Sequence, residues 1–347
     1  MEQMGVGGHN TNERVQPAEH RRKMIQLTQD LKLDLEKRNK EGKLPKVVFD
    51  FFLSAHVSSE DMKGIRKRII SGDVFLTESP GWNLDLLQYF NDVSRGEVDP
   101  KQKPINKATE NMFYELYGTK KPVGFIDLSD KDLVRLGREK SPFLDLEYPK
   151  VHVDGYEKGL ENMKLAVTKC CEENMEREQK IISQIVPQLE SIVKTNKKLK
   201  NNQQLKVTIF LGTVHVSIAE YMRHAGVEAT FTTQDPLDSF TLFQKQMLDN
   251  SRGNVVEMGR ERQKWLLFES FLVHKLSNRL EKVTLSTSRM GAVFNFLESN
   301  FSMTEVETVL SVGSVPRSTE LFFQLLRQKG LKIPASEEDI DRMISVG

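Results

Sequence analysis

The chain of 347 residues has only two cysteines, Cys170 and Cys171, which are neighbours in a stretch whose pattern predicts a helix. Neighbouring helical cysteines are badly placed to pair with each other, so disulfides cannot hold this fold, and a reducing cytoplasm fits best. An excess of one charge is also missing, since 50 Lys and Arg face 49 Asp and Glu. This balance favours neither nucleic acid nor an anionic membrane as a partner.

Long apolar runs are missing too. No stretch of about 18 apolar residues occurs, so we expect no membrane span. The opening residues, MEQMGVGGHNTNERVQPAEHRRK, lack the apolar segment of a secretory signal. Neither a phosphate-cradling glycine loop after a strand, nor a nucleophile elbow, nor a dinucleotide fingerprint is present. The sequence therefore names no substrate beyond a small molecule or a peptide.

The chain contains three segments whose patterns predict a strand followed by a short helix. The first unit runs from KVVFDFFL through a helix to a second strand, DVFLTE. Another, KKPVGFID, leads into LSDKDLVRLG, and the last, LKVTIFLGTVHV, leads into a helix and a further strand. A strand, a helix and a strand in this order form a parallel βαβ unit with a right-handed crossover. We therefore predict an α/β fold with a mainly parallel sheet.

Three regions follow from these patterns. Residues 1–42 form a polar lead and a packing helix, with apolar residues at helical spacing from Met24 to Leu35. Residues 43–235 form the α/β core domain. Residues 236–347 contain four helical stretches rich in leucine and phenylalanine, and we expect a helical cap or a C-terminal domain there.

Ionisable side chains follow the predicted strands at the points where the strands end. His56 follows the first strand, Glu78 ends the second, Asp127 ends another, and His215 follows a further one. The carboxyl ends of parallel strands meet at one edge, where ligands bind, and adjacent strands lie about 4.8 Å apart. We therefore predict that two imidazoles and one or two carboxylates converge there. Such a set suits a general base with its orienting partner, or a divalent metal ion bound by these four residues.

Each of these residues also has a structural interpretation. A single histidine at a strand end is usually a hydrogen-bonded loop residue, and Asp127 can simply cap the helix after it. Glu78 is harder to explain in this way, because it follows an apolar strand and a buried carboxylate without a partner is costly. Among the other histidines, His20 lies in polar surroundings with no sign of a partner, and we expect His224 to be exposed.

A long helix is predicted from Tyr156 to about Leu199, with a kink or a break at Pro187. Asn174 and Arg177 fall on its apolar face, where core residues are expected. One interpretation is that Arg177 reaches a buried anion, either a carboxylate or a substrate oxyanion. The other interpretation is that Arg177 belongs to a solvated run of charged residues.

In their order along the chain, these motifs resemble those of the superfamily that contains TIKI/TraB/GumN-like proteins, erythromycin esterases and ChaN haem-binding proteins. The matching elements are FLSAHV with His56, VFLTES with Glu78, KKPVGFIDLSD with Asp127, EREQKIISQI with Arg177 and FLGTVHVSIAEYMRHAGVEATF with His215. The resemblance extends from residue 45 to residue 235. It implies an α/β core with one site at the carboxyl edge of the sheet.

Two kinds of function agree with the residues and with the resemblance. One is a hydrolase of an ester or an amide, with or without a divalent metal ion. His56 or His215 would deprotonate water or bind the metal, Glu78 would orient a histidine, and Arg177 would stabilise negative charge. The other is a non-catalytic module that binds haem or another ligand, since Ser54 stands where the first motif has glycine. A third alternative is a regulatory scaffold whose helical C-terminal third recruits a partner.

Overall fold

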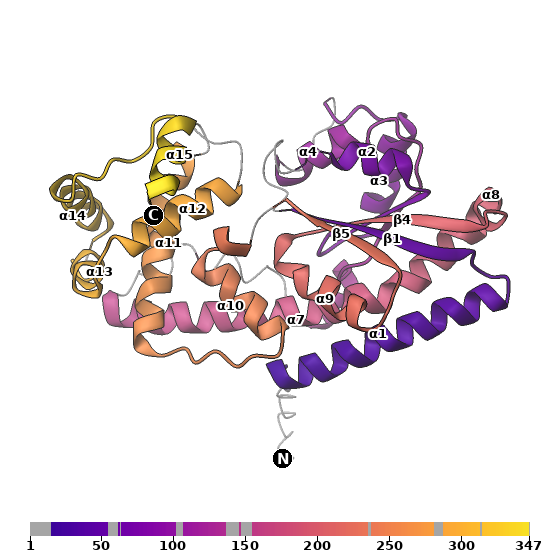
Figure 1. The fold of residues 1–347 in the computed structure, drawn as a ribbon, viewed down its shortest axis with the longest axis horizontal. Coiled ribbons are helices and arrows are strands. Elements are labelled where there is room, and N and C mark those ends of the chain that lie inside the picture. The colour runs from indigo at the N-terminus through magenta and orange to yellow at the C-terminus, as the bar shows by residue number, and fades with distance from the viewer. Residues whose placement is uncertain are drawn as a thin grey trace, which may run out of the picture.

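The fold is α/β, with a parallel sheet between two layers of helices and a helical C-terminal region beside them (Figure 1). The structure is a computed structural model. It describes residues 15–54, 62, 64–101, 107–136, 146, 155–234, 237–280, 287–312 and 314–346. Within these ranges the fold class predicted from the strand–helix units is confirmed.

The sheet has five strands in the order β3-β2-β4-β1-β5, and every pairing between them is parallel. The strands are β1 Lys46–Leu53, β2 Val74–Thr77, β3 Val123–Phe125, β4 Gln204–Leu211 and β5 Ala229–Thr233. β4 is inserted between β1 and β2, although β1 and β2 are consecutive in the chain. The carboxyl ends of β3, β2 and β4 therefore lie next to one another at one edge.

Helices cover both faces of the sheet, and its strands send apolar side chains to both sides, as is typical of a covered parallel sheet. Phe51 of β1 packs with one layer, α1, α7 and α9, whereas the next residue, Phe52, packs with the opposite layer, α2, α3 and α4. The helices of the α/β part are α1 Pro17–Lys40, α2 Ile65–Ser71, α3 Leu84–Arg95, α4 Lys107–Leu116, α5 Asp130–Arg135, α7 Tyr156–Thr195, α8 Lys197–Lys200 and α9 Val216–His224.

Helix α7 joins the two parts of the molecule. Its 40 residues span about 60 Å, at 1.5 Å per residue. Its first half packs against the C-terminal helices and its second half packs on the sheet. Of the kink or break predicted at Pro187, the break is wrong, since the helix runs through this residue. Pro187 has no backbone N–H to donate to the carbonyl of Ser183, one turn earlier. Both residues lie on the exposed face of the helix, so water can satisfy that carbonyl.

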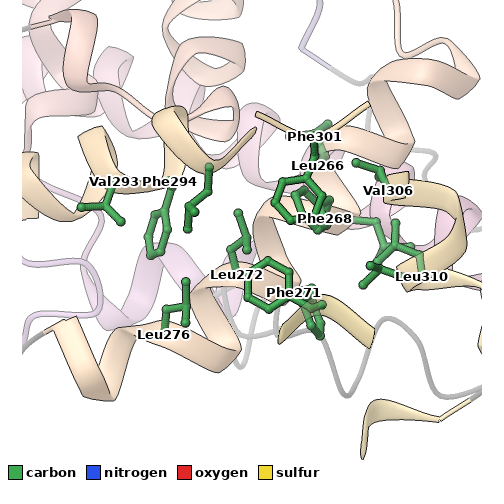
Figure 2. Packing of buried hydrophobic residues seen from close by; sticks show 14 of the residues in the cluster. Leu266, Phe268, Phe271, Leu272, Leu276, Val293, Phe294, Phe301, Val306 and Leu310 are labelled. Carbon is green, nitrogen blue, oxygen red and sulfur yellow. The ribbon is translucent and has the colours of Figure 1, made fainter. Parts of the chain in front are cut away.

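The C-terminal region is a bundle of helices packed around buried phenylalanines, among them Phe268, Phe271 and Phe301 (Figure 2). Its helices are α10 Leu242–Ser251, α11 Arg260–Leu280, α12 Thr287–Ser299, α13 Met303–Leu310, α14 Val315–Gln328 and α15 Glu337–Val346. Four of them correspond to the predicted stretches, whereas α13 and α15 were not predicted. No helix in the described ranges has both the length and the apolar character that crossing a membrane requires.

Candidate functional site

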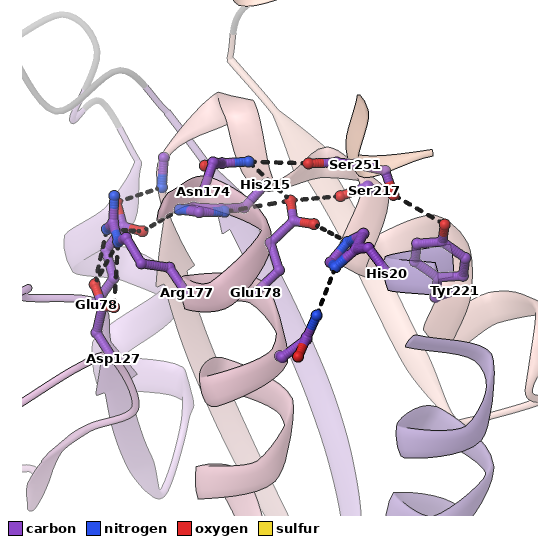
Figure 3. A network of polar contacts seen from close by, with 12 residues as sticks. His20, Glu78, Asp127, Asn174, Arg177, Glu178, His215, Ser217, Tyr221 and Ser251 are labelled. Carbon is purple, nitrogen blue, oxygen red and sulfur yellow. Dashed lines mark hydrogen bonds and ion pairs between the residues drawn. The ribbon is translucent and has the colours of Figure 1, made fainter. Parts of the chain in front are cut away.

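Three adjacent strands place ionisable residues at the same edge of the sheet. Glu78 follows β2 directly, Asp127 lies just beyond β3, and His215 ends the short turn η2 Thr213–His215 after β4. Figure 3 shows these side chains gathered around α7, which carries Arg177 and Glu178. The structure therefore brings together four of the five residues singled out in the sequence: Glu78, Asp127, Arg177 and His215.

Arg177 is buried and reaches two of these carboxylates. Its Nε lies 3.2 and 3.1 Å from the two oxygens of Asp127, and its Nη2 lies 2.7 Å from Asp127 Oδ2. The same Nη2 donates to Glu78 Oε2 at 3.1 Å. Burial opposes the charge of Arg177, but Asp127 and Glu78 outweigh burial and raise its pKa still further above its usual range. The interpretation of Arg177 as the partner of a buried anion is therefore the correct one.

Glu78 lies between the turn after β4 and helix α7. Its Oε1 accepts a hydrogen bond from the backbone N–H of Gly212 at 2.8 Å, and its Oε2 faces both Arg177 and His215. This set of partners accounts for a carboxylate at the end of a fully buried strand. Asp127 does not cap the helix that follows it, because Ser129 does so.

His215 lies between two carboxylates and has no exposed surface. Its Nδ1 lies 3.4 Å from Glu178 Oε1, and its Nε2 lies 2.9 Å from Glu78 Oε2. The contact to Glu78 is an ion pair without the alignment of a hydrogen bond. Burial alone would lower the pKa of His215, but Glu78 and Glu178 outweigh burial and raise that pKa to about 9. At neutral pH His215 is therefore an imidazolium.

Glu178 is a member of the site that the sequence did not point to. Its Oε1 accepts from Ser217 Oγ at 2.6 Å and from Asn174 Nδ2 at 3.4 Å, besides facing His215. Its Oε2 lies 3.0 Å from Nε2 of His20. Burial alone would raise the pKa of Glu178, but the hydrogen bonds of His20 and His215 lower it to about 2.

The expectation that His20 has no partner is wrong. Its side chain, on α1, is completely buried against Glu178 of α7. His20 lies one helical turn before Met24 on the same buried stripe of α1, which was the available signal. Because its neighbours in the sequence are charged, His20 was expected to lie in polar surroundings. His224, by contrast, is exposed as expected.

Comparison with known proteins finds no family model, no curated protein and no solved structure that matches this chain. The function is therefore argued from the geometry of this network.

The described residues do not fit a metal centre. Glu78 and Asp127 already face the cations Arg177 and His215, so a divalent ion would have to displace a guanidinium from two buried carboxylates. Within the described ranges, no group of three or more His, Cys, Asp or Glu is arranged to hold a metal ion. His56, the remaining predicted ligand and catalytic residue, lies outside the described residues.

The network has its solvent-facing side at Glu78 and Arg177. Their side chains are 11% and 9% exposed, whereas those of Asp127, Glu178 and His215 are fully buried. Nε and Nη2 of Arg177 are occupied, but its Nη1 makes no hydrogen bond to any residue that the structure describes. A cavity of about 680 Å³ lies elsewhere, among α12, α14 and α15, and contains no member of the network.

Proposed function

We propose that the chain is a hydrolase of an ester or an amide, with its active centre at Glu78, Arg177 and His215. The observation that carries the proposal is that Glu78 Oε2 faces two cations at once, Nη2 of Arg177 at 3.1 Å and Nε2 of His215 at 2.9 Å. One fixed cation at the solvent-facing side, Arg177, and a second one buried behind Glu78, His215, suit a reaction that develops negative charge on an oxygen.

In this proposal Arg177 stabilises the developing oxyanion. Asp127 and Glu78 hold its Nε and Nη2, so the guanidinium is fixed before substrate arrives, and Nη1 makes no hydrogen bond to a described residue. A donor that is already oriented needs no reorganisation during the reaction, and this makes its electrostatic contribution large.

His215 acts as the acid and not as the base. A base must be unprotonated, whereas the carboxylates of Glu78 and Glu178 hold the pKa of His215 at about 9. His215 is buried behind Glu78, so its proton reaches the leaving alkoxide or amine through that carboxylate: Nε2 of His215 gives the proton to Glu78 Oε2, and Glu78, which is partly exposed, gives it to the leaving group. The base that deprotonates water is assigned to His56 by the resemblance alone.

A ligand-binding module is the second candidate. It is favoured by the internal pairing of the network, in which both Asp127 oxygens and both Glu178 oxygens have protein partners. Haem ligation through His215 does not suit this arrangement, because both of its ring nitrogens face carboxylates. An absorbance titration with haem checks this point, since a Soret shift that depends on His215 would show that the ring does ligate haem.

The hydrolase is tested with Glu78→Gln and Glu220→Gln, the same substitution in the site and outside it. Glu220 of α9 pairs with Arg252 at the surface and belongs to no part of the network. The probes are p-nitrophenyl esters of different chain length and an amino-acid p-nitroanilide. Glu78→Gln should lose about 10²-fold or more in kcat/KM, whereas Glu220→Gln should retain activity. Equal rates in the wild type and in folded Glu78→Gln would overturn the proposal.

A further inference from the structure

The N-terminal helix supplies a side chain to this network from outside the sheet. His20 of α1 is completely buried, with Nε2 3.0 Å from Glu178 Oε2 and Nδ1 3.0 Å from Nε2 of Gln179 (Figure 3). Both partners belong to α7, so one imidazole is held at both of its nitrogens by consecutive residues of one helix.

These contacts define which nitrogen of His20 carries the proton. The amide nitrogen of Gln179 can only donate, so Nδ1 of His20 accepts. The proton then lies on Nε2, which donates to Glu178. A histidine fixed in one tautomer in this way presents a single, oriented donor to the carboxylate beyond it.

Glu178, held in place by His20, in turn orients the ring of His215. Its Oε2 is held by His20, while its Oε1 accepts from Ser217 and faces Nδ1 of His215 at 3.4 Å. The three groups come from α1, α9 and the turn η2, and all of them converge on one side chain of α7. The carboxylate cannot turn away from His215 without breaking the hydrogen bonds from His20 and Ser217.

The geometry points to His20 and Glu178 as positioning residues for His215, in a relay that runs from α1 through α7 to the end of β4. The charged groups that face His215 itself are Glu78 from the end of β2, and Arg177 and Glu178 from α7. A catalytic role for this relay rests on the hydrolase proposed above. The positioning of the His215 ring by His20 and Glu178 does not depend on that proposal.

The first experiment needs no substitution that could unfold the protein. Histidine is labelled with ¹⁵N in the full chain, and the tautomer of each ring is read at one fixed neutral pH by ¹H–¹⁵N correlation. We expect His20 as a single tautomer protonated on Nε2, and His215 with a proton on Nδ1 that exchanges slowly with water. His20 protonated on Nδ1 alone, or in a mixture of tautomers, would overturn the relay.

The second experiment asks whether His20 acts on His215 through Glu178. His20→Phe keeps an apolar body but removes the donor, and Glu178→Gln removes the charge. Each should speed the exchange of the Nδ1 proton of His215 by about tenfold or more, the equivalent of losing one hydrogen bond to a charged group. His20→Gln retains a donor and should restore slow exchange, while His224→Gln, on an exposed histidine of α9, should change nothing.

A purely structural role makes a different prediction. His20→Phe would then lower Tm, yet leave the exchange of the His215 proton as in the wild type, and this result would overturn the relay. Measurement of kcat/KM on the ester probes separates the two proposals. If the wild type hydrolyses no probe, the hydrolase fails, while the exchange rates still decide whether His20 and Glu178 position His215.

Discussion

The guanidinium of Arg177 donates from Nε and Nη2 to both oxygens of Asp127, which lies 50 residues earlier in the chain. Its Nη2 also donates to Glu78. One buried cation thus links α7 to the ends of two neighbouring strands. Because Asp127 is fully buried and Arg177 nearly so, the two charges depend on each other. Removing Arg177 leaves Asp127 buried without its cation, and removing Asp127 leaves Arg177 with Glu78 alone.

We therefore predict strong coupling between Arg177 and Asp127. Arg177→Met should lower the free energy of unfolding by about 3–5 kcal/mol, since it leaves Asp127 buried without its cation. The double variant Arg177→Met with Asp127→Asn should cost less than the sum of the two single changes. Urea denaturation of the four proteins measures this difference, and additive costs would show that the pair is not a unit.

The charge of His215 predicts a pH dependence of stability. Its pKa rises from 6.5 to about 9 on folding, so its contribution is complete below pH 6.5 and is lost as the pH increases through 9. The difference between these values, at about 1.4 kcal/mol per pH unit, is on the order of 3 kcal/mol. Glu178 acts in the opposite sense, because its pKa falls from 4.5 to about 2 and its contribution is lost in acid.

Denaturation between pH 5 and pH 10 checks this prediction. The wild type should lose stability above pH 6.5, and the free-energy difference between the wild type and His215→Gln should shrink over the same range. His224→Gln, which changes an exposed histidine, should follow the wild type. A difference between the wild type and His215→Gln that stays constant with pH would contradict the assignment of His215 as a buried imidazolium.

Metal removal should leave the protein unchanged. Arg177 and His215 already face the carboxylates that a divalent ion would need, so we expect neither EDTA nor added Zn²⁺ to shift Tm. Elemental analysis of the purified wild type and of the His56→Ala, His215→Ala double variant should give equal and negligible metal contents. A stoichiometric metal that disappears in the double variant would restore the metal-assisted hydrolase.

The sequence was most informative where structure is local. Apolar runs, glycine stops and helical spacing predicted the strand–helix units, and the parallel direction of the strands then implied one common edge for Glu78, Asp127 and His215. The insertion of β4 between β1 and β2 was not predicted, because strand order depends on pairings between segments far apart in the chain. It is this insertion that places β4, and with it His215, beside Glu78.

The missed members of the site have a common cause. Glu178 follows Arg177 in a charged run, and His20 lies 158 residues from its partner. Whether such a residue is buried depends on how α1 packs on α7, and the amphipathic pattern of either helix alone cannot specify that packing. The polar interruption at Asn174 and Arg177 was visible in the sequence, and Glu178 continues it on the same buried face, one turn beyond Asn174.

A buried carboxyl pair in the C-terminal region leads to the last prediction. Glu269 of α11 accepts hydrogen bonds from the first two backbone N–H groups of α10, at Leu242 (2.6 Å) and Phe243 (3.2 Å). Glu298 of α12 has a buried Oε1 without a hydrogen-bond partner in the described ranges. Burial raises the pKa of Glu298, and the charge of Glu269 raises it further.

Glu298→Gln should therefore stabilise the protein increasingly as the pH rises above 4.5, the ordinary pKa of a glutamate. A carboxyl group whose pKa is raised by folding binds its proton more tightly in the folded state, so stability is lost with rising pH, by at most about 1.4 kcal/mol per pH unit. Burial also raises the pKa of Glu269, to about 7, so Glu269→Gln removes a smaller ionisation penalty and weakens the acceptor at the start of α10. Its gain in stability with rising pH should therefore be smaller than that of Glu298→Gln. Differences from the wild type, measured by urea denaturation at pH 5 and pH 8, cancel the contribution of His215. If Glu298→Gln gains nothing between these two values, Glu298 ionises freely in the folded protein and is not held protonated by burial.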